Sequence, residues 1–307
     1  MINYYEIKGK ELTLTNDINS KILEIINPTD EDIQMISKKF NIDKKMIYHI
    51  KDKDEIARYE SMNNLNFISV LYPSKIDFYT YITRPMFIFW NEESLVVIVN
   101  ENVKIFDKNL KNKNYVIEED DKIEKLLLEI VWRLSQKYIT VMKDLNKNIE
   151  NLEEKIKKSS KTSDYYNIIN LQKSIIEFDI AIEQNSPVIM ELNNSKVVFV
   201  SDELNKMINS LQIEFKQAKV MVKKTLSILS AMSDLYTGII SNNLNDVMKI
   251  LTSITIVLTV PTIIGGLWGM NVRLPFENLT NAFYIIVGLC ILICILIFYL
   301  LKKDDYL

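Results

Sequence analysis

The sequence has few of the residues that build common catalytic and metal-binding centres. Its 307 residues include one histidine, His49, and two cysteines, Cys290 and Cys294. The cysteines are spaced i, i+4 in an apolar segment. Because free cysteine packs like a small hydrophobic residue, we interpret them as packing residues and not as a metal pair. We identify no cluster of partner residues around His49 and assign it no role.

Two further absences narrow the function. No Gly-rich phosphate loop and no nucleophile–base pair stands out, so we expect neither an enzyme nor an organic cofactor. The net charge is −3 and the isoelectric point is near 5.5, which argues against a nucleic-acid partner because such proteins usually present a basic surface. Residues 1–8 lack an apolar signal region, so we expect no export of the N-terminal part.

Charge is missing altogether from two C-terminal segments, residues 250–272 and residues 278–301. Each is longer than the roughly 20 residues that a helix needs to cross about 30 Å of hydrocarbon. Most charged residues precede Ile250. The sequence therefore predicts a multi-pass protein of the plasma membrane with two spans, most of its mass on one side, and the lipid bilayer as a partner.

The distribution of basic residues predicts the orientation of the spans. Lys302 and Lys303 follow the second span and Lys249 precedes the first, whereas the short connection holds only Arg273. Lysine and arginine near membrane helices favour the cytoplasmic side. We expect both termini in the cytoplasm and the connection outside the cell.

The residues before the spans divide into an α/β part and a helical part. In residues 1–120, Thr29 is placed to cap a helix that continues to Phe40, and a second short helix follows Asp43. Residues 67–72, 87–90 and 95–99 are β-branched or aromatic runs, typical of strands, and a hairpin turn fits residues 91–94. We expect a regulatory or scaffolding domain without chemistry here.

Helical periodicity dominates the rest of the chain. Residues 121–200 predict a hairpin of two helices, the second running from Asp164 to about Gln184 and ending before Pro187. Residues 201–271 contain no proline before Pro261, so one stalk helix about 100 Å long should continue into the membrane. A helix of this length needs partners, and homo-oligomerisation supplies them.

Small and polar residues form a stripe along this helix at alternating steps of three and four, the repeat of a coiled-coil seam. The stripe comprises Asp234, Gly238, Ser241, Asn245, Met248, Thr252, Thr255, Thr259, Thr262 and Gly266. Two interpretations are open. Small residues permit tight packing between helices, and threonine can bond its own helix; alternatively, polar groups at membrane depth line a water-filled axis between several copies.

Residues 241–252 and 261–271 resemble the first membrane helix of the CorA family of divalent-cation channels. The second of these segments ends in Trp268, Gly269, Met270 and Asn271. Residues 27–33, Arg84-Pro85 and residues 234–236 agree with the resemblance. It implies an α+β cytoplasmic domain, a long stalk helix and two C-terminal transmembrane helices in a funnel-shaped homopentamer. It also implies inward movement of Mg²⁺, often also of Co²⁺ or Ni²⁺, without ATP.

The resemblance assigns roles to individual residues. Gly269, Met270 and Asn271 would form the selectivity filter, in which Asn271 binds Mg²⁺ through the water that this ion retains. Met248 and Leu251 would form a hydrophobic constriction. The remaining pore-lining residues would be Asp234, Asn245, Thr252, Thr255, Thr259, Thr262 and Gly266, and Glu277 would be the carboxylate of the outer loop.

The sequence departs from the family pattern in three places and leaves regulation open. Trp268 precedes the tripeptide where tyrosine or phenylalanine is common, and Thr259 stands where a bulky apolar residue is usual. In the outer loop, Arg273 offsets Glu277. Family members sense cytoplasmic Mg²⁺ through carboxylates between subunits, but residues 207–211 contain no acid, so no regulatory site is assigned.

These expectations give a complete partition of the C-terminal part. After the stalk and first span (residues 201–271) come an extracellular loop (272–281), a second span (282–301) and a cytoplasmic tail (302–307). The leading hypothesis is a Mg²⁺ influx channel, driven by membrane potential and closed by internal Mg²⁺. The alternatives are a zinc transporter of the same superfamily, against which Met270 argues, and a membrane-anchored scaffold protein.

Overall fold

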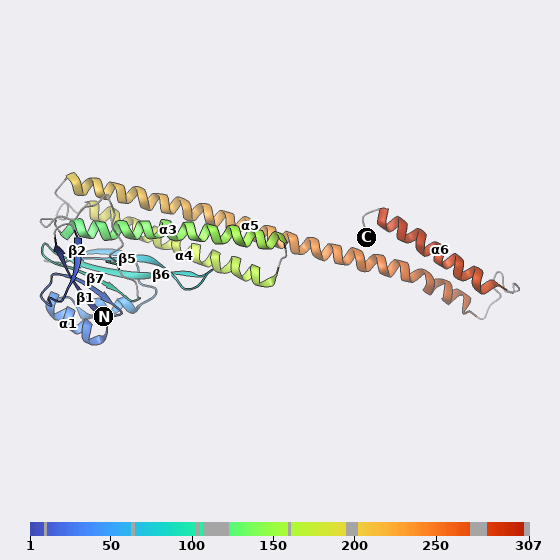
Figure 1. Cartoon of the computed structure of the whole chain (residues 1–307), viewed down its shortest axis with the longest axis horizontal. Helices are drawn as coiled ribbons and strands as arrows, with labels where there is room; N and C mark the ends of the chain where they lie inside the picture. Colours follow the sequence, from blue (N-terminus) through green and yellow to red (C-terminus); the bar gives the residue numbers. More distant parts are fainter. Residues whose placement is uncertain are drawn as a thin grey trace. The chain divides into compact units, whose positions relative to one another are not determined.

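A computed structural model of the protein describes residues 1–8, 11–62, 65–101, 105–106, 123–158, 161–194, 202–270 and 281–303 (Figure 1). Contacts divide the chain into two compact units, Met1–Ser233 and Asp234–Leu307. Helix α5, Asp202–Trp268, contributes residues to both units.

The first unit contains one sheet in the strand order β2-β1-β3-β7-β6-β5-β4. Among the described strands, β3 and β7 pair in parallel and the other neighbours are antiparallel. The strands are β1 (Ile2–Lys8), β2 (Glu11–Thr15), β3 (Ile22–Ile26), β4 (Arg58–Met62), β5 (Leu65–Lys75), β6 (Tyr81–Trp90) and β7 (Leu95–Val99). The central strands β3 and β7 are buried along their whole length, because both faces of the sheet are covered.

Short helices cover one face of the sheet. They are α1 (Asp30–Phe40), α2 (Lys44–Tyr48) and the 3-10 turn η1 (His49–Lys51). Alternate residues of β3, β7 and β6 point into this core, as the two-residue period of a strand requires. The core comprises Leu23, Ile25, Phe67, Phe87, Phe89, Val96 and Ile98 from the sheet and Ile33, Ile36, Ile42, Ile47 and Ile50 from the helical side.

Helix α1 confirms the predicted cap. The Thr29 hydroxyl accepts a hydrogen bond from the Asp32 amide at 3.2 Å, and the Asp32 carboxylate accepts one from the Thr29 amide at 3.0 Å. Both bonds satisfy amides that the first turn leaves unpaired. The predicted turn between β6 and β7 is also confirmed, because the Asn91 amide donates to the Ser94 carbonyl oxygen at 3.0 Å.

Four strands, β1 to β4, were not predicted from the sequence. In β3 the apolar run is interrupted by Glu24, whose side chain is fully buried. Its carboxylate accepts hydrogen bonds from the Tyr5 hydroxyl at 2.9 Å and from the Asn3 amide group at 3.0 Å. The Ile105 amide adds a further bond at 2.5 Å. Donors so distant in sequence cannot be recognised from a local pattern, so the strand was missed.

Helices α3 (Ile123–Lys158) and α4 (Thr162–Asn194) lie on the face of the sheet opposite α1 (Figure 1). The predicted end of α4 before Pro187 is wrong, since the helix continues to Asn194 with Pro187 inside it. A proline removes one main-chain hydrogen bond. The buried side chains of Val188, Ile189 and Leu192 anchor the following turns and offset that loss.

Helix α4 contacts the sheet through hydrogen bonds to main-chain amides. Four polar side chains on one side of the helix act as the acceptors. The pairs are Tyr81 N to Ser174 Oγ (2.9 Å), Thr83 N to Glu177 Oε2 (3.3 Å), Ala57 N to Gln184 Oε1 (3.1 Å) and Leu71 N to Asn185 Oδ1 (2.8 Å). Three of these amides belong to strands and Ala57 immediately precedes β4, so the four bonds use main-chain donors; at Glu177 the Thr83 hydroxyl adds a side-chain bond at 3.3 Å.

The contact at Leu71 is the most complete of the four. The Asn185 amide group also donates to the Leu71 carbonyl oxygen at 2.8 Å, and the Tyr138 hydroxyl donates to the same oxygen at 2.9 Å. Burial raises the pKa of Tyr138 well above its ordinary value, because it penalises the charged phenolate. Tyr138 therefore remains a neutral donor, and both main-chain groups of Leu71 are satisfied.

Helix α5 begins in the first unit with a buried seam. Its buried residues recur at alternating steps of four and three, the spacing of a coiled-coil seam. The residues on this spacing are Leu204, Ile208, Leu211, Phe215, Ala218, Val222, Thr225, Leu229 and Met232, and Met207 is buried beside them. Polar contacts join this part of α5 to the hairpin: the Thr225 hydroxyl donates to the Asn146 side chain at 2.9 Å, and Lys219 pairs with Glu183 at 3.1 Å.

Candidate functional site

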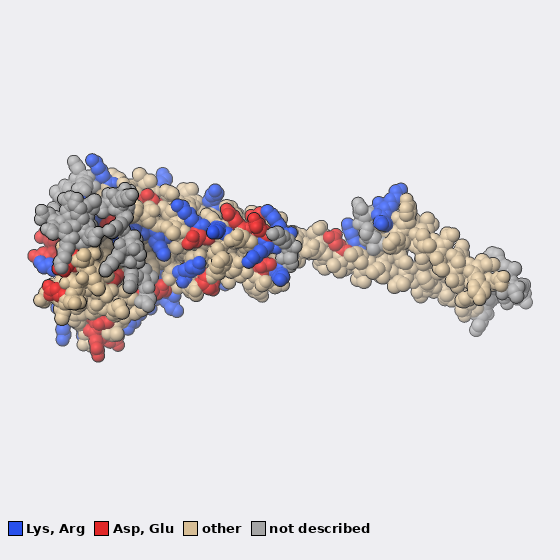
Figure 2. Space-filling model, viewed as in Figure 1, with Lys and Arg blue, Asp and Glu red and all other residues tan. Residues whose placement is uncertain are grey.

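The second unit contains the rest of α5 and helix α6 (Ala282–Lys303), and it buries very little. Among the described residues from Thr237 to Met270, Ser253 alone is buried, and no residue of α6 is. Both α5 and α6 are long and apolar enough to cross a membrane. Figure 2 shows that the charged side chains gather over the first unit and at the C-terminal end of α6, whereas the rest of α6 carries none. The unit therefore lacks the covered surface that a helix pair in water requires.

Helix α6 packs along one face of α5. The Cys294 thiol lies 3.7 Å from the Val257 carbonyl oxygen. A groove of about 700 Å³ between the two helices is lined on the α5 side by Pro261, Ile264 and Trp268, and a second groove of about 340 Å³ is lined by Val257 and Pro261. With the buried Ser253, these residues define the α6-facing side of α5. Cys290 and Cys294 line the same grooves, which agrees with a packing role.

The predicted polar stripe lies on the other side of α5. Each residue advances the helix by about 100°, so Thr252, Thr255, Thr259 and Thr262 point about half a turn away from Ser253, Val257 and Ile264. All four threonines are exposed in the single chain. Gly266, next along the stripe, has open space where a Cβ would stand. Helix α6, which packs on the opposite side of α5, therefore leaves the stripe uncovered.

The threonine hydroxyls of the stripe are oriented by their own helix. Thr255 donates to the Leu251 carbonyl oxygen at 2.8 Å, Thr259 to Thr255 at 2.7 Å and Thr262 to Leu258 at 2.9 Å. Since the hydroxyl protons of these three threonines are used within the helix, this part of the stripe presents oxygen lone pairs. An array of acceptors suits a hydrated cation, whose coordinated waters are hydrogen-bond donors.

The two ends of the stripe differ in character. Towards the first unit, Asp234 and Asn245 are exposed on α5, and the apolar side chains of Met248 and Leu251 follow, with exposed fractions of 51% and 56%. At the far end α5 stops at Trp268, and the Gly269 amide donates to the Gly265 carbonyl oxygen at 3.0 Å. A Cβ at Gly269 would lie 3.3 Å from that oxygen, so glycine suits the close approach there.

Two predicted site residues fall outside the described structure. Asn271 and Glu277 lie in residues 271–280, so their roles stay predictions. Gly269 and Met270 are described just beyond the end of α5, and Met270 lines the groove against α6.

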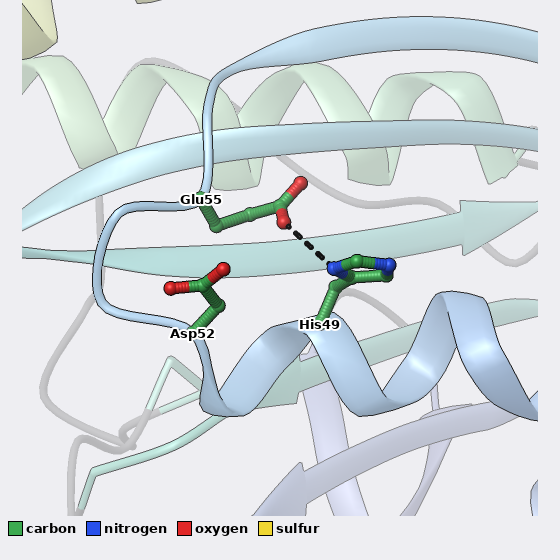
Figure 3. A group of neighbouring side chains, drawn as sticks. All are labelled: His49, Asp52 and Glu55. Atoms are coloured by element: carbon green, nitrogen blue, oxygen red, sulfur yellow. Dashed lines mark ion pairs between the residues drawn. The ribbon is translucent and has the colours of Figure 1, made fainter.

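A group of side chains in the first unit was missed by the sequence analysis. The expectation that His49 has no partner cluster is wrong, because Asp52 and Glu55 lie beside it (Figure 3). The His49 Nδ1 and Glu55 Oε2 atoms are 3.4 Å apart. The sequence signal that could have identified this group is the spacing His-x₂-Asp-x₂-Glu across the end of η1. This spacing brings the three side chains together only when the chain turns after Asp52.

The architecture defines a class of protein: a membrane protein in which an α+β domain precedes two C-terminal apolar helices, the first of them continuous with a long helix. The model of the CorA-like Mg²⁺ transporter family matches residues 19–303. The chain belongs to this family. Among curated relatives, the cobalt/magnesium transport protein CorA of Methanocaldococcus jannaschii is 23% identical over 289 residues, which cover 93% of this chain and 90% of the relative.

Solved structures agree on the fold. The complete structure of the CorA magnesium transporter from Methanocaldococcus jannaschii matches with a TM-score of 0.83 and 22% identity, covering 100% of this chain and 98% of that one. The cytoplasmic domain of ZntB from Vibrio parahaemolyticus matches with a TM-score of 0.56 and 11% identity, covering 78% of this chain and 96% of that one. At these identities the likeness concerns the fold, so it does not choose between the ions that the relatives carry.

Proposed function

We propose that several copies of this chain form a membrane channel for hydrated Mg²⁺, and that the polar stripe of α5 lines its pore. The observation that carries the proposal is the position of the stripe: α6 covers the opposite side of α5, so Thr252, Thr255, Thr259 and Thr262 are left for an axis between copies. Family membership favours a homopentamer, in which each of the five chains contributes one α5.

The chemistry of the stripe suits weak binding of a hydrated cation. Mg²⁺ releases its water reluctantly and is commonly held through water. Hydroxyl oxygens whose protons are already donated within the helix, together with the amide oxygens of an Asn271 ring, accept hydrogen bonds from that water. A ring of carboxylates would hold the ion more tightly and slow its release.

The direction and control of transport follow from charge and polarity. With both termini in the cytoplasm, an inside-negative potential favours entry of a doubly charged ion by about 4.6 kcal/mol per 100 mV. Met248 and Leu251 form the constriction, because a narrow apolar ring excludes water and ions. Internal Mg²⁺ closes the channel, and residues 1–120 and 121–200 form the cytoplasmic part that senses it.

Co²⁺ is a second substrate of the proposed channel, as the name of the relative from Methanocaldococcus jannaschii suggests, and Ni²⁺ is a third.

The deciding experiment measures Mg²⁺ entry into proteoliposomes that contain the full-length protein, read by a trapped fluorescent indicator at imposed potentials. We expect uptake that grows with inside-negative potential and is lost in Asn271→Ala. The matched control is Asn281→Ala, an exposed asparagine at the start of α6, which should transport normally. Absence of uptake at every potential from an intact oligomer would overturn the proposal and favour a scaffold. Uptake of Zn²⁺ but not Mg²⁺ would favour a zinc transporter.

A further inference from the structure

The His49 cluster is the one group of possible metal ligands found among the described residues. Its ligand atoms, one each from His49, Asp52 and Glu55, all lie within 4.8 Å of one another. Figure 3 shows the three side chains converging from η1 and the loop that follows it. We propose that this cluster binds a divalent transition-metal ion, at a site separate from the conduction path. The proposal does not depend on transport by the pore.

Buried hydrophobic residues hold the framework of the site. Ile47 and Ile50 are in the core of the first unit, with exposed fractions of 0% and 1%, and they fix η1 beneath His49. The Asp52 amide donates to the His49 carbonyl oxygen at 2.9 Å, which closes the turn. Farther along the loop, the Ala57 amide donates to Gln184 of α4 at 3.1 Å. Both ends of the segment that carries the ligands are therefore anchored.

Glu55 is the residue that distinguishes this cluster from an ordinary group of surface charges. Its side chain is only 6% exposed. One carboxylate oxygen, Oε1, contacts the Arg58 guanidinium as an ion pair, and among the described residues it has no hydrogen bond of good geometry. The other oxygen, Oε2, faces the imidazole of His49 (Figure 3). Carboxylate oxygen and imidazole nitrogen are both ligands that a divalent transition metal accepts, so an ion between Glu55 and His49 could bind both.

The distances fit ligands around an ion better than a direct hydrogen bond. The 3.4 Å between His49 Nδ1 and Glu55 Oε2 is longer than a normal N–H···O bond of about 2.7–3.2 Å. Nitrogen and oxygen ligands about 2.1 Å from a tetrahedral ion stand about 3.4 Å from each other. The other separations in the cluster are at most 4.8 Å, so closure of at most about 1.4 Å brings the ligand atoms to this spacing. The His49 side chain is 56% exposed and can make that movement.

The balance of charge also suits a cation. Arg58 carries the nearest positive charge, but its Nε atom is paired with Glu60 at 2.6 Å, so part of that charge is already compensated. Asp52 and Glu55 add two negative charges. The imidazole decides the class of ion, because nitrogen ligands favour Co²⁺, Ni²⁺ and Zn²⁺, whereas Mg²⁺ prefers oxygen and water. We therefore expect the site to select transition metals against Mg²⁺.

A chemical footprint can test the site in the full-length protein, because His49 is the only histidine of the chain. Carbethoxylation of imidazole by diethyl pyrocarbonate then reports on this residue alone. We expect Co²⁺ to slow the modification of His49 by about ten-fold or more, and Mg²⁺ at the same concentration by less than about two-fold. The protein carries Cys290→Ser and Cys294→Ser, so that thiols do not bind the probe.

Variants show whether the carboxylates contribute. Glu55→Gln and Asp52→Asn should each require about ten-fold more Co²⁺ for the same protection. Asp54→Asn is the matched control, an exposed aspartate in the same loop that is not part of the cluster, and should behave like the parent protein. Equal protection by Mg²⁺ and Co²⁺, or none by either, would overturn the proposal. So would protection that persists in both Glu55→Gln and Asp52→Asn. If Glu55→Gln fails to fold, Asp52→Asn and the comparison of ions still decide.

Discussion

The two units of the chain use helix α5 in different ways. Up to Met232, its apolar seam is buried within the first unit. From Thr237 to Met270, Ser253 alone is buried among residues that are otherwise exposed or half-buried. The alternating steps of three and four that define the buried seam can be continued along α5 past Tyr236. They lead to Ser253, Val257 and Ile264, which lie on the side of α5 that faces α6. The same face of α5 thus makes the contacts within the chain before Tyr236 and again from Ser253 onward, and the opposite face of the second unit stays exposed in the single chain.

The difference between the units predicts that the same kind of substitution has different effects in each. In the first unit a buried side chain is part of the fold, so its loss should destabilise the protein. In the second unit the exposed stripe makes few contacts within the chain, so a change there should affect transport and leave folding intact. Four substitutions test this contrast.

The largest effect is expected for Phe215→Ala in the buried seam of α5. Phe215 is 2% exposed, and removal of a buried aromatic ring costs about 3–5 kcal/mol. A denaturant titration of the purified protein, followed by tryptophan fluorescence, measures the loss. The control is Ile213→Ala, at a position that is 66% exposed, which should change the free energy of unfolding by less than about 0.5 kcal/mol. Similar losses in both variants would show that the seam is not the stabilising face.

A smaller loss is expected for Asn185→Leu, which removes the contact of α4 with Leu71. The Leu71 amide would lose its acceptor inside the protein, at a cost of about 1–3 kcal/mol, whereas Tyr138 would still donate to the carbonyl oxygen. The same titration measures it. Asn151→Leu on α3, where the asparagine is exposed, is the control and should be nearly neutral. A neutral Asn185→Leu would mean that packing alone holds α4 on the sheet.

The third substitution is Thr225→Val, at a threonine buried in the first unit. Its hydroxyl lies 2.9 Å from two acceptors, the Asn146 side-chain oxygen and the Met221 carbonyl oxygen, and loss of the hydroxyl should lower the free energy of unfolding by about 1 kcal/mol. Transport should be unaffected, because Thr225 is outside the predicted stripe. A change in Mg²⁺ uptake without a change in stability would contradict the division between the units.

The smallest effect on stability is expected for Thr262→Val in the exposed stripe. The Thr262 hydroxyl bonds only its own helix in the single chain, at 2.9 Å to the Leu258 carbonyl oxygen, so the free energy of unfolding should change by less than about 0.5 kcal/mol. Mg²⁺ uptake should fall by about five-fold, the equivalent of one hydrogen bond of about 1 kcal/mol. Unchanged uptake would favour the packing interpretation of the stripe.

The sequence predicted the features that depend on neighbouring residues. The capped start of α1, the turn between β6 and β7 and the two apolar helices all follow from local spacing and are confirmed. The strand β3 was missed because Glu24 is stabilised by donors far away in the sequence. The end of α4 was placed too early because Pro187 is a strong local signal, whereas the buried residues beyond it owe their stability to tertiary packing.

The candidate site was predictable to a similar extent. The stripe on α5 is a matter of helical phase, which the sequence contains, but the position of α6 opposite it required the structure. The cluster around His49 was overlooked because its members are brought together by the turn after η1. The roles of Asn271 and Glu277 stay predictions.

The contacts of α4 have a consequence for how this domain can diverge between species. Because Ser174, Glu177, Gln184 and Asn185 bind main-chain amides, the strands and the residue before β4 offer the same donors with any side chain except proline. Mutations can therefore accumulate in the strand residues without altering these bonds, whereas each of the four helix residues is individually constrained. Comparison of homologues should accordingly find the helix side of this interface to be the slower-evolving one.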